Sequence, residues 1–216
     1  MRPARRAADR GARGACRVSA RVVLATHNPH KVEEFQAIVA TARPDLEVVA
    51  YDGPEPVEDG VTFAANALIK ARAAASHTGL AALADDSGIC VDVLGGAPGV
   101  FSAYWAGHRK DARANLELLL DQLSDIADPH RGAQFVSTIA LVRADGSEEV
   151  VEGVWPGRLA HAPAGAGGFG YDPIFVPDGQ PAGAERTVGE WAAEEKNADS
   201  HRARAFAALL PLLHAL

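Results

Sequence analysis

The chain has 216 residues, of which 48% are hydrophobic and 23% are charged, and its formal net charge is −7. No apolar run approaches the roughly 20 residues that a membrane-spanning helix needs, and two cysteines are too few for a disulfide framework, which favours a reducing cytoplasm. The eight histidines show neither HxH nor HxxxH spacing, so no zinc signature is present.

Residues 1–20 differ in composition from the rest of the chain. They contain six arginines against one aspartate and show no apolar periodicity. We expect a disordered extension or a misassigned start, with an organelle transit peptide as the alternative. The remaining residues, 21–216, carry a formal charge of about −12, which argues against a nucleic-acid partner. Their number allows one large domain or two small lobes.

Alternating strands and helices are predicted for the first half of the chain. Short apolar runs indicate strands, and apolar residues that recur on one face indicate helices. Thr62 is a candidate N-cap. The predicted elements are a strand at 22–25, a helix at 31–42, a strand at 47–51, a helix from 62 to about 77, and a strand at 80–84 that ends at Asp85 and Asp86.

A hairpin and two further helices are predicted for the second half. Residues 95–107 read as a loop, and a helix follows at 111–123. Strands at 135–142 and 148–155 pair across Ala144-Asp145-Gly146. A glycine-rich loop then leads to a short apolar strand, and the last helix covers 200–213. Together these elements predict a mixed α/β sheet.

Polar residues gather where predicted strands end and helices begin, which is where ligands bind in open α/β sheets. The first group, Thr26 to Lys31, lies between a buried strand and a helix. A helix N-terminus offers free amide donors and partial positive charge, so it can bind a phosphate. The alternative is an ordinary N-cap with Lys31 in solvent.

Two acidic groups follow. Glu58-Asp59-Gly60 precedes a helix on which Asn66 and Lys70 share a face, although the helix dipole alone also favours acidic residues there. Asp85-Asp86-Ser87-Gly88 has two interpretations. It is either an Asp-Ser-Gly turn or a pair of carboxylates that binds a divalent cation, typically together with substrate phosphates.

The fourth group spreads over the C-terminal third of the chain. It comprises Phe169 to Asp172, then Lys196, then Ser200-His201-Arg202. Cations are unfavourable at the start of a helix, so His201 and Arg202 indicate a polar or anionic ligand there. The aromatic residues of this group can stack on a base.

Five motifs, taken together and in order, resemble the inosine triphosphate pyrophosphatase family. They run from about Arg21 to the C-terminus. The motifs are "LATHNPHKVEEF", "EDGVTFAANALIKARAAA", "ADDSGICVDVLGGAPGVFSA", "GGFGYDPIF" and "EEKNADSHRARA". The resemblance implies an elongated mixed β-sheet with flanking helices, as one domain with two lobes around a central cleft. It also implies a homodimer.

The activity implied by the resemblance is Mg²⁺-dependent hydrolysis of ITP, dITP and XTP to the monophosphate and pyrophosphate. Asp86 would be the general base and, with Glu58, would hold the metal, while Ser87 would lie beside the substrate. The implied phosphate-binding segment is Thr26, His27, Asn28, Pro29, His30 and Lys31. The implied nucleoside-binding residues are Phe169, Gly170, Tyr171, Asp172, Lys196, His201 and Arg202.

Some positions depart from the family pattern. His27 replaces a more usual Gly or Arg, Tyr104 replaces an Arg found in many bacterial members, and Phe101 replaces a Tyr. Two other functions are considered: a pyrophosphatase for modified pyrimidine or methylated nucleotides, and a catalytically silent nucleotide-binding module. The FGYD and SHR motifs argue against the first. Asp86, Lys31 and Lys196 argue against the second.

Overall fold

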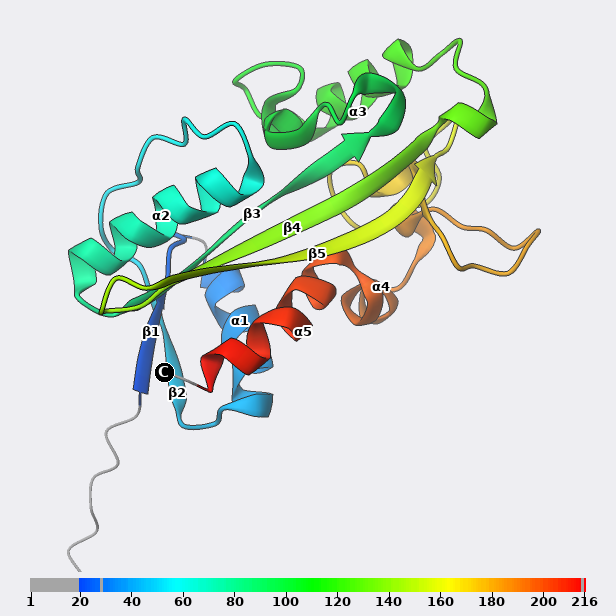
Figure 1. Cartoon of the computed structure of the whole chain (residues 1–216). Coiled ribbons are helices and arrows are strands. Elements are labelled where there is room, and N and C mark those ends of the chain that lie inside the picture. The colour runs from blue at the N-terminus through cyan, green and yellow to red at the C-terminus, as the bar shows by residue number, and fades with distance from the viewer. Residues whose placement is uncertain (1–19, 28, 215) are drawn as a thin grey trace, which may run out of the picture.

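The computed structural model describes residues 20–27, 29–214 and 216, which form a six-stranded sheet flanked by helices (Figure 1). The strand order is β2-β1-β3-β4-β5-β6. β1 runs parallel to β2 and to β3, whereas the pairs β3–β4, β4–β5 and β5–β6 are antiparallel. The strands are β1 (Ala20–Leu24), β2 (Leu46–Ala50), β3 (Ala81–Val91), β4 (Gly132–Val142), β5 (Glu148–Leu159) and β6 (Phe175–Pro177).

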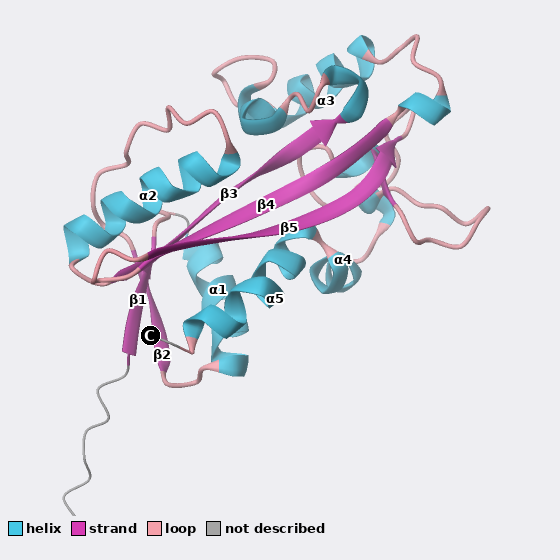
Figure 2. Ribbon diagram, in the orientation of Figure 1, coloured by secondary structure: helices cyan, strands magenta, loops and turns pink. Residues whose placement is uncertain are grey.

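Helices cover both faces of the sheet, as Figure 2 shows. α2 packs on one face, while α1 and α5 pack on the other. The alternation of side chains along β3 separates the two layers, because Leu83 contacts the α1 and α5 side and Ala84 contacts α2. The helices are α1 (Pro29–Ala42), α2 (Phe63–Thr78), α3 (Ala112–Gln122), α4 (Ala193–Asp199) and α5 (His201–Leu213).

The hydrophobic core is divided along the length of the sheet. One large cluster joins α1 and α5 to β1, β2 and the first part of β3. A second large cluster lies toward the other end of β3–β5 and includes Leu119, Trp155 and Phe175. The long strands β3, β4 and β5 connect the two clusters, which gives the molecule its elongated form (Figure 1).

Most predicted elements are confirmed within one or two residues. Thr62 caps α2, its side chain accepting from the amide of Ala65. The predicted hairpin is β4–β5, with its turn at Ala144–Gly146. Ala20, predicted to belong to the N-terminal extension, is instead the first residue of β1. The rest of that extension, residues 1–19, lies outside the described residues.

The predicted end of β3 is wrong. The strand does not stop at Asp85 and Asp86 but continues to Val91, so Ser87 and Gly88 form no turn. Their backbones pair with Ser137 and Val136 of β4. A neighbouring strand therefore satisfies the backbone groups that a turn would otherwise have to satisfy.

Two further segments differ from expectation. The predicted loop at 95–107 contains a 3₁₀ helix, Gly99–Tyr104. α4 was not predicted at all, since its seven residues, AEEKNAD, show no apolar periodicity. No helix among the described residues is both long enough and apolar enough to cross a membrane.

Candidate functional site

The site is built around a part of β3 that has a strand on only one side. β1 pairs with β3 as far as Leu24 and Leu83, and the last link is the 2.7 Å bond from the Ala25 amide to the Leu83 carbonyl. Beyond that point β3 keeps β4 on its other edge. Asp86 and Ser87 thus lie just past the carboxyl end of β1, where open α/β sheets bind ligands.

A lysine connects two carboxylates on the α2 face of this segment. Lys70 Nζ lies 3.0 Å from Glu58 Oε2 and 3.4 Å from Asp86 Oδ1. Asn66, one turn earlier on the same face of α2, accepts a 2.9 Å hydrogen bond from the Gly60 amide. The face predicted from the spacing of Asn66 and Lys70 therefore holds both the loop that carries Glu58 and the Asp86 side chain.

Burial and charge shift the pKa values in this cluster. Burial raises the pKa of Asp86, and the ammonium of Lys70 limits that rise. Burial acts to lower the pKa of Lys70, but the carboxylates of Asp86, Glu58 and Asp85 outweigh it, so the pKa of Lys70 is raised. Lys70 is therefore held as a cation beside a carboxylate with enhanced proton affinity.

The cluster fits a magnesium ion that completes its shell with substrate. Asp86 Oδ2 is buried and makes no well-aligned hydrogen bond among the described residues, although the Asn66 side chain lies near enough to lower the pKa of Asp86, so this oxygen can still serve as a metal ligand. Mg²⁺ usually binds one or two carboxylates together with substrate phosphates and water. Among the described residues no group of three or more His, Cys, Asp or Glu side chains could hold a metal by itself.

The turn between β1 and α1 borders this cluster. Thr26, His27, Glu58 and Lys70 line a small cavity of about 40 Å³. α1 begins at Pro29, two residues before the predicted start, so the backbone of Pro29, His30 and Lys31 forms its first turn. Asn28 and the side chains of those three residues lie outside the described part of the structure, so their predicted contacts with phosphate remain predictions.

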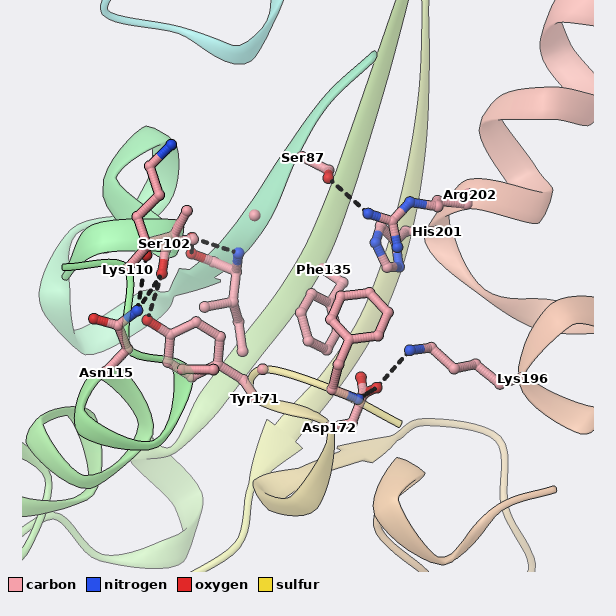
Figure 3. A pocket seen from close by; sticks show the side chains of 16 residues that line it. Ser87, Ser102, Lys110, Asn115, Phe135, Tyr171, Asp172, Lys196, His201 and Arg202 are labelled. Atoms are coloured by element: carbon pink, nitrogen blue, oxygen red, sulfur yellow. Dashed lines mark hydrogen bonds and ion pairs between the residues drawn. The ribbon is translucent and has the colours of Figure 1, made fainter. Parts of the chain in front are cut away.

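The other predicted residues meet in a single cavity on the far side of β3. This cavity has a volume of about 320 Å³ and is bounded by β3, the Phe169–Asp172 segment, α4 and the start of α5 (Figure 3). Its lining includes Ser87, Phe169, Gly170, Tyr171, Asp172, Lys196, His201 and Arg202. Residues separated by more than 100 positions in the sequence thus converge on a space large enough for a base.

Charged groups fix the geometry of this cavity. Asp172, almost fully buried, accepts from Lys196 Nζ at 2.5 Å and from the Phe169 amide at 2.7 Å. Lys196 Nζ lies 4.2 Å from the centroid of the Phe169 ring, and the Arg202 guanidinium lies 5.4 Å from it. The Arg202 Nη2 donates to Ser87 Oγ at 3.3 Å. Phe169 nevertheless remains 64% exposed, so its ring is available for stacking.

His201 is a buried neutral imidazole. Its ring stacks on Phe135, with 4.9 Å between centroids. Burial, with Arg202 and Lys196 acting in the same direction, lowers the pKa of His201 to about 3. Its Nδ1 is buried and has no hydrogen-bond partner in the described residues. Gly153 on β5 makes this position possible, because a side chain there would overlap the His201 carbonyl.

The opposite wall of the cavity combines the predicted Tyr171 with residues that the sequence does not single out. Asn115 on α3 donates to the Ala103 carbonyl at 2.9 Å, and the Tyr171 hydroxyl donates to the Ser102 carbonyl at 2.9 Å. Lys110 also lines this wall. Its backbone φ is 55°, which among the described residues is the one positive φ outside glycine. No sequence pattern indicates Asn115 or Lys110, because Asn115 contacts backbone groups and Lys110 lies in an irregular segment. Two of the residues that differ from the family pattern lie nearby: Tyr104 stacks on His108, and Phe101 is half exposed.

Comparisons with known proteins identify the family of the chain. Residues 22–212 match the model of the Ham1 family. The chain is 63% identical to a dITP/XTP pyrophosphatase of Leifsonia xyli over 91% of this chain and 96% of that protein. It is 56% identical to a dITP/XTP pyrophosphatase of Streptomyces coelicolor over 91% and 98% of the two chains.

Solved structures show the same fold. A nucleoside-triphosphatase, also described as a dITP/XTP pyrophosphatase, from Mycobacterium abscessus has a TM-score of 0.76 at 51% identity, covering 88% of this chain and 99% of that one. A HAM1 protein from Coxiella burnetii has a TM-score of 0.82 at 38% identity, covering 91% and 100%. The fold, the sequence match and the ordered motifs lead to one conclusion: the chain belongs to the Ham1 family.

Proposed function

We propose that this protein is a Mg²⁺-dependent nucleoside-triphosphate pyrophosphatase that hydrolyses dITP, ITP and XTP to the monophosphate and pyrophosphate. One observation carries the proposal. Two features flank the same short segment of β3. One is a cavity for a base, lined by eight of the predicted residues, and the other is the cluster of Asp86, Lys70 and Glu58. The names of the relatives, dITP/XTP pyrophosphatases, support the choice of substrate.

Recognition of the base is assigned to Phe169, Arg202 and His201. The exposed ring of Phe169 stacks on the base without regard to its substituents. Arg202 has only hydrogen-bond donors, so it suits the 6-carbonyl of hypoxanthine or xanthine and opposes the 6-amino group of adenine. Neutral His201 has one donor and one acceptor and can adapt to either group. Selection against adenine therefore depends on Arg202.

Hydrolysis is assigned to Asp86. Its carboxylate, whose pKa burial raises, takes a proton from the water that attacks the α-phosphorus. Lys70 and the N-terminus of α1 place positive charge beside the phosphates. Glu58 and Asp86 would hold the metal. When bound, Mg²⁺ polarises phosphoryl oxygens and offsets charge on the departing pyrophosphate.

Two properties of the molecule in the cell belong to the same proposal. We expect the enzyme to work in the cytoplasm, because two cysteines are too few for a disulfide framework. We also expect a homodimer, as the family resemblance implies. Sedimentation equilibrium should then give about twice the chain mass of 22.6 kDa, and a monomer at micromolar concentration would exclude it.

The proposal is tested by measuring pyrophosphate release with Mg²⁺ from dITP, ITP and XTP, and from ATP, GTP and a methylated pyrimidine triphosphate. Asp86→Asn is measured alongside, with Asp125→Asn, an exposed aspartate on another surface, as the matched control. The proposal is supported if the wild type hydrolyses dITP, ITP and XTP, and if Asp86→Asn abolishes this activity while Asp125→Asn does not. Preference for the pyrimidine supports the alternative enzyme, and binding without turnover supports a silent module.

A further inference from the structure

We propose that His27 is a positioning residue that fastens the loop between β2 and α2 to the β1–α1 turn and thereby holds Glu58 at the site. The inference rests on the proposed function, since it gives Glu58 a place in the reaction. Its evidence is a set of contacts made by His27 and Tyr51 with three consecutive loop residues.

The loop is long and has no regular structure of its own. It runs from Tyr51 to Thr62 and lies beside α2 (Figure 1). Glu58 is near the middle of this stretch of sequence. Its first part wraps around the ring of Tyr51, which is buried. The Tyr51 hydroxyl donates to the Pro54 carbonyl at 2.9 Å. A side chain at Gly53 would overlap the same ring, so the approach depends on glycine.

His27 holds the residues on either side of Pro54. Its Nδ1 lies 3.0 Å from Glu55 Oε1, and its Nε2 lies 3.0 Å from the Gly53 carbonyl. The ring also stacks on Tyr51, with 5.6 Å between centroids and 22° between planes. His27 follows directly on Thr26, so these contacts join the loop to the turn that begins α1.

Both nitrogens of His27 face acceptors, and this favours one protonation state. A neutral imidazole has a single N–H, whereas the imidazolium donates from both nitrogens. The hydrogen bond with Glu55 accordingly raises the pKa of His27, and the Gly53 carbonyl and Asp52 act in the same direction. From α2, His77 contacts the other side of Tyr51, and Lys70 with Glu58 lines the adjoining cavity.

The contacts of His27 matter for Glu58 because the two ends of a short segment are held separately. Glu55 is held by His27, and Glu58, three residues later, is held by Lys70 at 3.0 Å. Val57 between them is 81% exposed and gives the segment no core contact. Without His27, the segment would keep the Tyr51 contact at Pro54, the Lys70 contact at Glu58 and the Asn66 contact at Gly60, but none of the described residues would hold the Glu55 side chain, so the carboxylate that the reaction needs in one place would be less well fixed.

The test compares His27→Ala, His27→Arg and Glu55→Gln with the wild type. Hydrogen exchange of residues 52–59, measured without nucleotide or metal, should be faster in His27→Ala and Glu55→Gln. The kcat/KM for dITP should fall about tenfold in His27→Ala and by less in Glu55→Gln, whose amide oxygen can still accept a hydrogen bond, with more Mg²⁺ needed for half-maximal rate. His27→Arg, a planar cation with several donors, should restore protection and rate. His161→Ala, which removes an exposed histidine–aspartate pair elsewhere, is the control.

A pH profile separates positioning from mere packing. The raised pKa of His27 means that its contacts are complete below about pH 6.5 and are weakened as pH rises through the higher value in the folded protein. Since His27→Arg keeps its charge, the ratio of wild-type to His27→Arg kcat/KM should fall over that range. A constant ratio, unchanged exchange in His27→Ala, or faster exchange with unchanged kcat/KM would overturn the inference. A wild-type protein inactive on dITP would instead refute the proposed function, whatever the exchange shows.

Discussion

At the scale of single residues, Asp86 combines burial with an unpaired oxygen. Asp86→Asn keeps the shape of the side chain but removes a proton acceptor and a negative charge. We expect turnover of dITP to fall by about 10²–10⁴-fold, the usual effect of losing a general base. The midpoint of thermal unfolding should change little, because burial already disfavours the Asp86 charge and Glu58 still pairs with Lys70 in the variant. Near-normal turnover would remove Asp86 from the mechanism.

Arg202 is expected to distinguish carbonyl from amino substituents. In Arg202→Ala, kcat/KM for ITP should fall much more than kcat/KM for ATP, since only ITP loses a matched hydrogen bond. An unpaired donor costs about 1–3 kcal/mol or more when charged, so the ITP to ATP ratio should shrink at least tenfold. Stacking on Phe169 should survive. If the ratio is the same in wild type and variant, another residue selects the base.

His201 should make the fold sensitive to acid. Its pKa is about 3 in the folded protein and 6.5 without the fold, so between these values the unfolded chain binds a proton that the native state rejects. Stability is therefore lost as pH falls from about 6.5 towards 3, by about 2–3 kcal/mol at about pH 4.5. Urea unfolding of wild type and His201→Gln at pH 7 and 4.5 tests this. Equal losses in both proteins would contradict it.

At the scale of elements, Arg131 joins α3 to the end of β5. The side chain is fully buried and donates to the carbonyls of Leu123, Ile126, Leu159 and Ala160. Arg131→Met should fill the space but leave these carbonyls unsatisfied, costing about 3 kcal/mol or more. Arg113→Met, at an exposed arginine of α3, should change the free energy of unfolding little. Similar losses in the two variants would refute the role of Arg131.

Elements with a regular apolar pattern could be predicted from the sequence. α2, with Thr62 as its cap, and the β4–β5 hairpin are examples. For β3 the sequence predicts too early an end, because Asp-Ser-Gly has the composition of a turn. Its continuation depends on β4, which lies about 50 residues later and supplies the hydrogen bonds. The polar side chains are tolerated there because the opposite edge of β3 faces the site and carries no strand.

The sequence indicates eight residues that line one cavity, but it does not indicate how they are arranged. The ordered motifs indicated the residues that now line one cavity. Alternation along β3 then places Asp86 and Ser87 on opposite faces, and this division could not be seen without the full length of the strand. The neutral state of His201 likewise follows from Phe135 and Trp155, which reach it through the fold alone.

At the scale of the whole molecule, the elongated sheet separates two tasks. The end with α1, α2 and Lys70 gathers the groups assigned to phosphate and metal, and the end with α3 and α4 forms the base cavity. β3 passes between them and contributes Asp86 to one and Ser87 to the other. A nucleotide that spans this strand would place its α-phosphorus near Asp86, between the base and the departing pyrophosphate.

The position of water attack tests this account most directly. dITP is hydrolysed with Mg²⁺ in ¹⁸O-labelled water, and the products are analysed by mass spectrometry. Attack at the α-phosphorus predicts one ¹⁸O atom in the deoxyinosine monophosphate and unlabelled pyrophosphate. Label in the pyrophosphate, or release of orthophosphate with a nucleoside diphosphate, would contradict the assignment of Asp86 to the water that attacks the α-phosphorus.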